Sequence, residues 1–149
     1  MIEGGNNIHA NIIMNMQRLP SKMEFIEILQ KEVTFKKENP EERYEMLKEI
    51  GFGGFARIYL AKELSTGDLH ALKYMKASKK KERESIINEI GIMKICCKDS
   101  PNIVKFHEAY EFDKKIWLFL ELMDCGSLTE YVGCGRQTIS EEVCAYILL

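Results

Sequence analysis

The sequence has 149 residues, of which 46% are hydrophobic and 30% charged, the balance of a soluble globular domain with a real core. Its 21 Lys and Arg against 23 Asp and Glu give a formal net charge of -2, which offers no electrostatic footprint for nucleic acid or an anionic membrane. The five cysteines form no C-x-x-C pair and do not cluster with the three histidines, so no metal site is expected. No signal peptide or membrane span is recognisable, and the free thiols predict a cytoplasmic location.

The first part of the chain is expected to be an extension outside the main domain. Residues 1–20 are rich in Asn and Met without a clean period, which predicts disorder or weak order. Ser21 and Glu24 have the spacing of a capping box and predict a helix near 21–31. The apolar stripe of this helix favours packing against its own domain, and a detachable regulatory helix is the alternative. Residues 36–42 are charged and contain an Asn-Pro turn signal, which indicates a solvated linker.

A strand pattern begins at Tyr44. Four further segments rich in β-branched or aromatic residues follow, and a turn at 65–68 separates the second from the third. The five predicted strands cover residues 44–50, 57–60, 69–75, 103–110 and 116–120.

Between the third and fourth strands the pattern predicts a helix over roughly 84–97. Apolar residues recur there at spacings of three and four, as on the buried face of an amphipathic helix. The charge run just before it, 79–84, indicates the solvated entry to this helix. Two adjacent cysteines near its end, Cys96 and Cys97, are interpreted as buried thiols. After a break at Gly126, helical character returns at 127–132 and from 140 onward.

The first chemical signal is a glycine-rich segment between two predicted strands, made of Gly51, Phe52, Gly53, Gly54, Phe55 and Ala56. Glycines at such a place let backbone N–H groups approach a phosphate without obstruction by side chains. A plain hairpin turn is the structural alternative. A dinucleotide-binding fold needs these glycines to open a helix, whereas a strand follows here. A classical P-loop needs Gly-Lys-Ser/Thr, which the segment lacks.

A lysine on the third strand favours another type of nucleotide loop, in which strand, glycines and strand are followed by a lysine. Lys73 lies in an apolar segment, where an ammonium costs free energy unless an anion pairs with it. Glu89, sixteen residues later, borders the apolar face of the predicted helix and can supply that anion. A surface carboxylate without a special partner is the alternative for Glu89.

Together these segments resemble the N-terminal lobe of a eukaryotic protein kinase followed by the start of its C-terminal lobe. Gly51 and Gly53 match the first two glycines of the kinase loop, and Ala56 takes the third place, a departure from the family pattern. Three further segments resemble the entry to the fourth strand, the fifth strand with the hinge, and the start of the C-terminal lobe, in residues 101–104, 116–123 and 124–128. The resemblance covers roughly residues 44–149 in unbroken order.

The resemblance implies an α+β fold, with a twisted five-stranded antiparallel sheet, one packed helix, and the first helices of an incomplete helical lobe. It divides the chain into a partly disordered extension, 1–43, an ATP-binding lobe, 44–121, and a hinge with the truncated start of the second lobe, 122–149.

The resemblance also implies an ATP site. Lys73, held by Glu89, would orient the phosphates under the glycine-rich loop as a phosphate-positioning pair. The backbone of Glu121 and Met123 would hydrogen-bond the adenine edge. Apolar surface for the adenine would come from Ile50, Ile58, Ala71 and Leu120, the last in the gatekeeper position. Ordinary sheet core is the alternative for these apolar residues. In a complete enzyme the further partners would be Mg²⁺, a protein substrate and regulatory proteins.

Within the family, residues 86–90 and 126–129 are most similar to the PAK/GCK-type serine/threonine kinases, and 20–40 is similar to the PAK autoinhibitory segment. The His-Arg-Asp and Asp-Phe-Gly motifs, which carry the catalytic and metal-binding groups, do not occur, and the chain ends inside a predicted helix. The expectation is the ATP-binding part of a signalling serine/threonine kinase, truncated and inactive on its own. A non-catalytic chain that binds nucleotide or a partner is the alternative.

Overall fold

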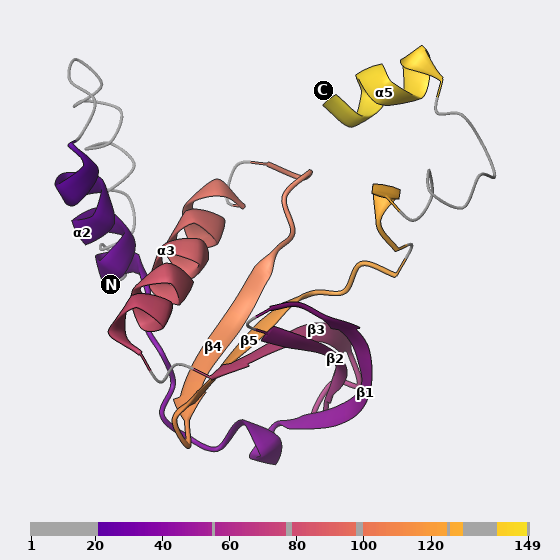
Figure 1. Ribbon diagram of the computed structural model, residues 1–149. Coiled ribbons are helices and arrows are strands. Elements are labelled where there is room, and N and C mark those ends of the chain that lie inside the picture. Colours follow the sequence, from indigo (N-terminus) through magenta and orange to yellow (C-terminus); the bar gives the residue numbers. More distant parts are fainter. Residues whose placement is uncertain are drawn as a thin grey trace, which may run out of the picture.

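The computed structural model describes residues 21–54, 56–76, 79–97, 100–124, 126–129 and 140–148. The expectations for residues 1–20, for Phe55 and for 130–132 lie outside these residues. Figure 1 shows the elements, which in chain order are α2 (Lys22–Glu32), η1 (Pro40–Glu42), β1 (Tyr44–Phe52), β2 (Ala56–Glu63), β3 (Leu69–Lys76), α3 (Lys80–Cys96), β4 (Phe106–Phe112), β5 (Lys115–Glu121) and α5 (Glu141–Leu148). None of the helices described is long and apolar enough to cross a membrane.

The five strands form a single antiparallel sheet in the order β1-β2-β3-β5-β4. The predicted α+β fold is confirmed, with α3 as the helix inserted between β3 and β4 (Figure 1). The turn between β2 and β3 relies on Gly67, whose φ of +82° is easily reached only by glycine. The turn between β4 and β5 is a two-residue hairpin turn in which Asp113 and Lys114 both have positive φ.

Helix α3 begins earlier than the sequence predicts, so the charge run forms its first turns. Its lysines are exposed, as the interpretation of a solvated entry expects. The backbone N–H of Lys79 donates to the carboxylate of Glu82 at 3.1 Å, which caps the helix start. The interpretation of Cys96 and Cys97 as buried thiols is wrong, because Cys96 is exposed and Cys97 is only half-buried. Cys96 lies six residues after the buried Ile90, about 240° around the helix, and therefore faces away from the core.

Alternation along the strands gives the sheet two apolar faces. On the face covered by α3, the core consists of Met75, Ile86, Ile90, Ala109, Ile116 and Leu118. The opposite face carries a second core, richer in aromatic residues, made of Tyr44, Ala61, Leu72, Tyr110, Trp117 and Phe119. In that core the rings of Tyr44 and Phe119 stack with centroids 3.8 Å apart. The central strands β3 and β5 are therefore held from both sides.

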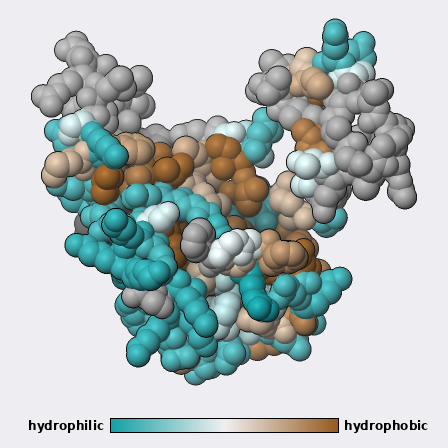
Figure 2. Space-filling model, in the orientation of Figure 1, coloured by the Kyte–Doolittle hydropathy of each residue, from teal (hydrophilic) through white to brown (hydrophobic). Residues whose placement is uncertain are grey.

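Helix α2 begins with the capping box that the sequence predicts. The N–H of Ser21 donates to Oε2 of Glu24 at 2.7 Å, and the N–H of Glu24 donates to Oγ of Ser21 at 3.3 Å. The helix packs on α3 through Leu29, which is only 2% exposed. Figure 2 shows hydrophobic side chains gathered in the region of α2 and α3, whereas hydrophilic side chains cover much of the sheet below. Met23 and Phe25 are among the exposed apolar residues of α2.

The segment after α2 is not the solvated linker that its charges suggest. The N–H of Lys36 donates to the carbonyl of Ala109, and the N–H of Glu111 donates to the carbonyl of Lys36, both at 2.9 Å. These bonds add a short parallel bridge to β4. Pro40 is buried at the start of η1. The sequence pattern misleads here because the lysines have carboxylate partners on a strand that is far away in the sequence.

Acidic side chains tie this segment to the sheet. Glu108 of β4 accepts hydrogen bonds from Lys36, Arg43, Tyr44 and Tyr110. Burial alone would raise the pKa of Glu108, but the hydrogen bonds from Lys36 and the two tyrosines outweigh it and lower that pKa. On β2, Glu63 accepts from Nε and Nη2 of Arg43 at 3.0 and 2.9 Å, and this contact lowers the pKa of Glu63.

These lowered pKa values predict a loss of stability in acid. The folded pKa of Glu108 lies below the unfolded value of 4.5, so the unfolded state binds more protons in the acid range. The stabilisation is complete above the unfolded pKa and is lost as the pH falls through the folded pKa. Glu108→Gln should lower the thermal midpoint at neutral pH. It should also make the unfolding free energy depend less steeply on pH in the acid range, because one carboxyl group contributes at most about 1.4 kcal/mol per pH unit to that slope.

The measurement is a series of thermal unfolding curves between about pH 7 and about pH 3. Glu45→Gln, which changes an exposed carboxylate of β1, is the control and should leave the acid dependence as it is. An acid dependence that is the same for Glu108→Gln and for the unmodified chain would contradict the assignment.

Candidate nucleotide site

The contact between Lys73 and Glu89 joins the sheet to α3. Lys73 lies in the middle of β3, between Ile58 of β2 and Leu118 of β5. Its Nζ donates a hydrogen bond to Oε1 of Glu89 at 2.5 Å. The side chains of Lys73 and Glu89 are 23% and 42% exposed, so the pair lies at the border between the core and solvent. Glu89 is therefore not an unpartnered surface carboxylate, and its ammonium partner stays within reach of a ligand.

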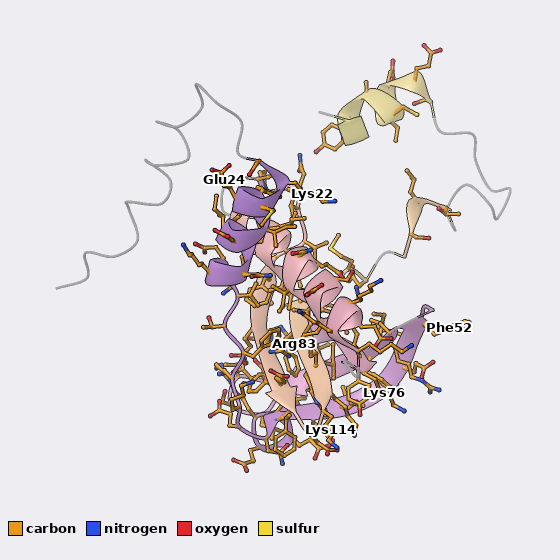
Figure 3. The ribbon with its side chains drawn as sticks, turned by 60° about the vertical axis from the view of Figure 1, so that its left-hand side comes forward. Lys22, Glu24, Phe52, Lys76, Arg83 and Lys114 are labelled. Carbon is orange, nitrogen blue, oxygen red and sulfur yellow. The ribbon has the colours of Figure 1, made fainter. Side chains whose placement is uncertain are left out.

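The pair lines a cavity of about 470 Å³ between the glycine-rich loop and the first turns of α3. The volume falls in the range of small-molecule sites. In Figure 3 the labelled Phe52 and Lys76 mark this end of the sheet, where the loop lies near the last residue of β3. The cavity is lined by Gly53, Gly54, Ala56, Lys73, Met75, Lys76, Lys81, Glu82, Ser85, Ile86 and Glu89.

The charge of this lining favours an anion. The lining contains three lysines and two glutamates. Glu89 is paired with Lys73, and Glu82 lies 3.6 Å from Lys79. Lys76 and Lys81 take part in no ion pair within the described part of the chain, so their positive charge is not compensated locally.

The glycines of the loop are not required by the fold itself. A Cβ atom added at Gly51 or Gly53 would meet its nearest neighbours at 3.7 and 3.9 Å, which are ordinary contacts. A Cβ atom at Gly54 would meet nothing within 4 Å, and none of these three glycines has φ in the left-handed range. The absence of side chains therefore suits a ligand that approaches the backbone from outside, as a phosphate does.

Strand register places the apolar residues expected around an adenine in one region of the sheet. Ala71 of β3 pairs with Leu60 of β2 on one side and with Leu120 of β5 on the other. Two residues further along β3, Lys73 pairs with Ile58. Because residues two apart on a strand share a face, Ile58, Ala71 and Leu120 lie on the same face as Lys73. A flat ligand on this face would meet apolar side chains first and the ammonium at its far end.

The remaining expected contacts lie at the edges of this face. Ile50 and Phe52 of β1 are exposed, Phe52 to 86%. Glu121 ends β5, where its N–H donates to the carbonyl of Lys105 at 2.9 Å. Met123, just beyond the strand, is 63% exposed. The cavity thus brings together five of the expected residues, Gly53, Gly54, Ala56, Lys73 and Glu89, and does not extend to Glu121 or Met123.

Sequence reasoning missed the contribution of the first turns of α3. Lys81, Ser85 and Glu89 follow one another at intervals of four residues, so they share one helix face, and all three line the cavity. That spacing is the available signal. Lys81 is exposed, as the charge run predicts, and it lines the cavity as well. Lys76, at the end of β3, gave no signal beyond its position three residues after Lys73.

The site suits phosphates better than a bare metal ion. In the described ranges no three His, Cys, Asp or Glu side chains are grouped so that they could hold a metal. The two carboxylates of the cavity, Glu82 and Glu89, already face lysines. The described residues therefore offer backbone N–H groups and ammonium groups for phosphate oxygens, and no carboxylate set for Mg²⁺.

A second, smaller cavity of about 270 Å³ lies between the segment after α2 and β4. It is lined by Thr34, Phe35, Lys36, Lys94, Phe106, His107, Glu108 and Ala109. Its central carboxylate, Glu108, is occupied by the hydrogen bonds described above. The cavity borders none of the glycines of the loop and is the natural comparison site for ligand mapping.

Known proteins show which family the chain resembles. The Protein kinase domain family model matches residues 44–149. The chain is 28% identical over 143 residues to serine/threonine-protein kinase 1 of Arabidopsis thaliana. The aligned region covers 95% of this chain and 16% of that protein. The chain is also similar to the solved twitchin kinase region from C. elegans, with a TM-score of 0.63 and 27% identity, covering 74% of this chain and 19% of that chain. The chain thus spans less than one fifth of the length of either relative.

Proposed function

This chain belongs to the protein kinase domain family, and from that premise we propose that it forms the ATP-binding part of a serine/threonine protein kinase. Residues 44–121 act as the N-terminal lobe, and residues 122–149 as the hinge and the start of the C-terminal lobe. The observation that carries the proposal is the contact between Lys73 and Glu89 in a cavity that is closed on one side by glycines.

The phosphates of ATP lie in this cavity. Lys73 orients them, and Glu89 holds the ammonium in place so that little reorganisation is needed when the anion arrives. Backbone N–H groups of the loop donate to phosphate oxygens, which the missing side chains of Gly53 and Gly54 allow. The N–H of Gly53 donates to the carbonyl of Ala56 at 2.8 Å, so it has to exchange this bond for one to a phosphate. Lys76 and Lys81, which line the cavity and form no ion pair with any residue that the structure describes, raise the local positive potential and favour a triphosphate over a neutral ligand.

The adenine lies on the apolar region of the sheet that includes Ala71. Ala71 is small enough to let the adenine ring approach, and Ile58 and Leu120, on the same face of the sheet, add apolar contacts around it. The backbone carbonyl of Glu121 and the backbone of Met123 hydrogen-bond the polar edge of the ring. The partly exposed side chains around this surface lose solvent contact on binding, which contributes about 25 cal/mol per Å² of apolar area.

Phosphoryl transfer needs further groups. The sequence contains neither His-Arg-Asp nor Asp-Phe-Gly, the motifs whose side chains would hold Mg²⁺ and orient an acceptor hydroxyl in this family. We infer that residues 1–149 alone bind nucleotide weakly and do not transfer the γ-phosphate. Transfer to protein Ser or Thr belongs to a longer polypeptide, and residues 86–90 and 126–129 favour the PAK/GCK-type subgroup for it.

Amide chemical shift mapping tests the proposed site. The isotope-labelled chain is titrated with a non-hydrolysable ATP analogue and, separately, with adenosine and with inorganic triphosphate. We expect the ATP analogue to shift the amides of residues 51–54, Lys73 and 121–123. Adenosine should shift the amides of residues 121–123, and triphosphate those of residues 51–54. Shifts confined to the lining of the second cavity, or no shifts with any ligand, would exclude the proposed site.

A further inference from the structure

The position of α3 depends on α2. Helix α2 is the most extensive backbone neighbour of α3, ahead of any strand of the sheet. Figure 1 shows the two helices side by side, with α3 on the side of α2 that faces the sheet. Because α3 carries Glu89, whatever holds α3 in place also holds the carboxylate that meets Lys73.

Gly91 is the point of closest approach between the two helices. A Cβ atom at this position would lie 2.9 Å from both Cβ and the carbonyl oxygen of Leu29, and 3.1 Å from its Cα. Two of these three atoms belong to the backbone of α2, so rotating a side chain would not relieve the clash. Glycine in a helix interior is less favourable than alanine, so this position is explained by the packing and not by helix formation.

Further contacts fix α2 on both α3 and the sheet. Nζ of Lys94 on α3 donates to the carbonyl oxygen of Glu32, the last residue of α2, at 2.8 Å. A cation at this end of a helix satisfies a carbonyl that lacks a helical partner. Val33 and Phe35 then pack against the core beneath α3, and the backbone of Lys36 pairs with β4. Helix α2 is therefore anchored to the sheet directly after it leaves α3.

The contacts of α3 lie on two flanks of its buried stripe. Gly91 follows Glu89 by two residues, about 200° around the helix, and the buried Ile90 lies between them. One flank meets Lys73 and the other meets Leu29. A movement of α3 that withdrew Glu89 from Lys73 would therefore have to break or compress the contact with α2.

We propose that α2 is a brace that holds α3 where Glu89 reaches Lys73, and that Gly91 and Lys94 are the positioning residues through which it acts. The consequence for phosphate binding rests on the proposed function, because the contact orients phosphates only if the site binds ATP. The effect of α2 on the contact itself does not depend on any nucleotide.

The test measures how well Glu89 shields the amine of Lys73. The full chain is treated with a limiting amount of an amine-acetylating reagent, and mass spectrometry compares acetylation of Lys73 with that of Lys62, an exposed lysine of β2. Glu89→Gln gives the rate for Lys73 without its carboxylate partner. Gly91→Leu and Leu29→Asp should each raise the relative rate about two- to fivefold, the factor that corresponds to an ion pair of this exposure. The variant that combines Gly91→Leu with Leu29→Asp should acetylate Lys73 no faster than either single variant.

Two more variants complete the design, with every rate measured well below the thermal midpoint of the variant. Cys96→Ala changes an exposed residue of the same helix and should match the unmodified chain. Lys94→Met keeps most of the side chain and removes only the charged donor. It should raise the Lys73 rate, and it decides the question if Gly91→Leu does not fold.

Lower thermal midpoints with an unchanged Lys73 rate in Gly91→Leu, Leu29→Asp and Lys94→Met would overturn the proposal, since α2 would then only add stability. Titrations with ATP and adenosine separate this outcome from a failure of the nucleotide site. An unmodified chain that binds neither ligand refutes the nucleotide site, while the acetylation rates still decide the role of α2.

Discussion

Replacing Ala71 with phenylalanine should lower the affinity of the chain for ATP by at least about 100-fold. Ala71 faces the same side of the sheet as Lys73 and lies between Leu60 and Leu120, so a benzyl group there would occupy the space proposed for the adenine. Forcing the benzyl group aside costs about 1–3 kcal/mol, and the adenine ring would also lose its apolar contacts with the sheet. Titration with a fluorescent ATP analogue measures the loss.

Leu69→Phe is the matched control for this substitution. Leu69 lies two residues earlier in the same strand, is exposed, and pairs with Lys62 at the end of the sheet away from the glycine-rich loop. Leu69 is on the same face as Ala71, but it lies outside the row Leu60, Ala71 and Leu120 and is exposed, so the added ring has solvent to occupy. ATP affinity should therefore stay within about twofold of the unmodified chain. Equal affinities for Ala71→Phe and Leu69→Phe would place the adenine elsewhere.

The sheet was predictable because its signals are local. Alternation of apolar residues, the Gly67 turn and the break before the fourth strand are all visible within short windows of sequence. The pairing of Lys73 with Glu89 was predictable for a different reason. A lysine in an apolar strand needs an anion, and the helix pattern offered one carboxylate beside its buried face. The structure places the two groups 2.5 Å apart.

The parts that the sequence hid depend on contacts between distant segments. The lysines at 36 and 37 suggested solvent, yet Lys36 pairs with Glu108 and Lys37 with Glu111, each more than seventy residues away. Gly91 gave no signal as a packing site, because a glycine inside a helical pattern has the same appearance whether it is tolerated or needed. Only its distance to the backbone of Leu29 distinguishes the two.

Lys73→Met should separate phosphate positioning from nucleotide binding. Methionine has a similar length and flexibility but no charge, so the apolar contacts around it remain while the phosphates lose their ammonium. ATP affinity should fall roughly tenfold, as expected when one charged hydrogen bond is lost at a partly exposed site. Phosphotransfer should fall on the order of 10²–10³-fold, because a preorganised charge at the reacting phosphate is lost.

The most direct test of the central claim is therefore the ratio of these two losses in the same polypeptide. Residues 1–149 are extended by segments that carry the His-Arg-Asp and Asp-Phe-Gly motifs, with Lys62→Met as the matched surface control. Labelled ATP, Mg²⁺ and a basic protein substrate report transfer, and the unextended chain gives the baseline without transfer. We predict that Lys73→Met lowers transfer far more than it lowers ATP affinity, while Lys62→Met changes neither. Transfer that is unchanged by Lys73→Met, or that falls only in step with ATP affinity, would contradict the account.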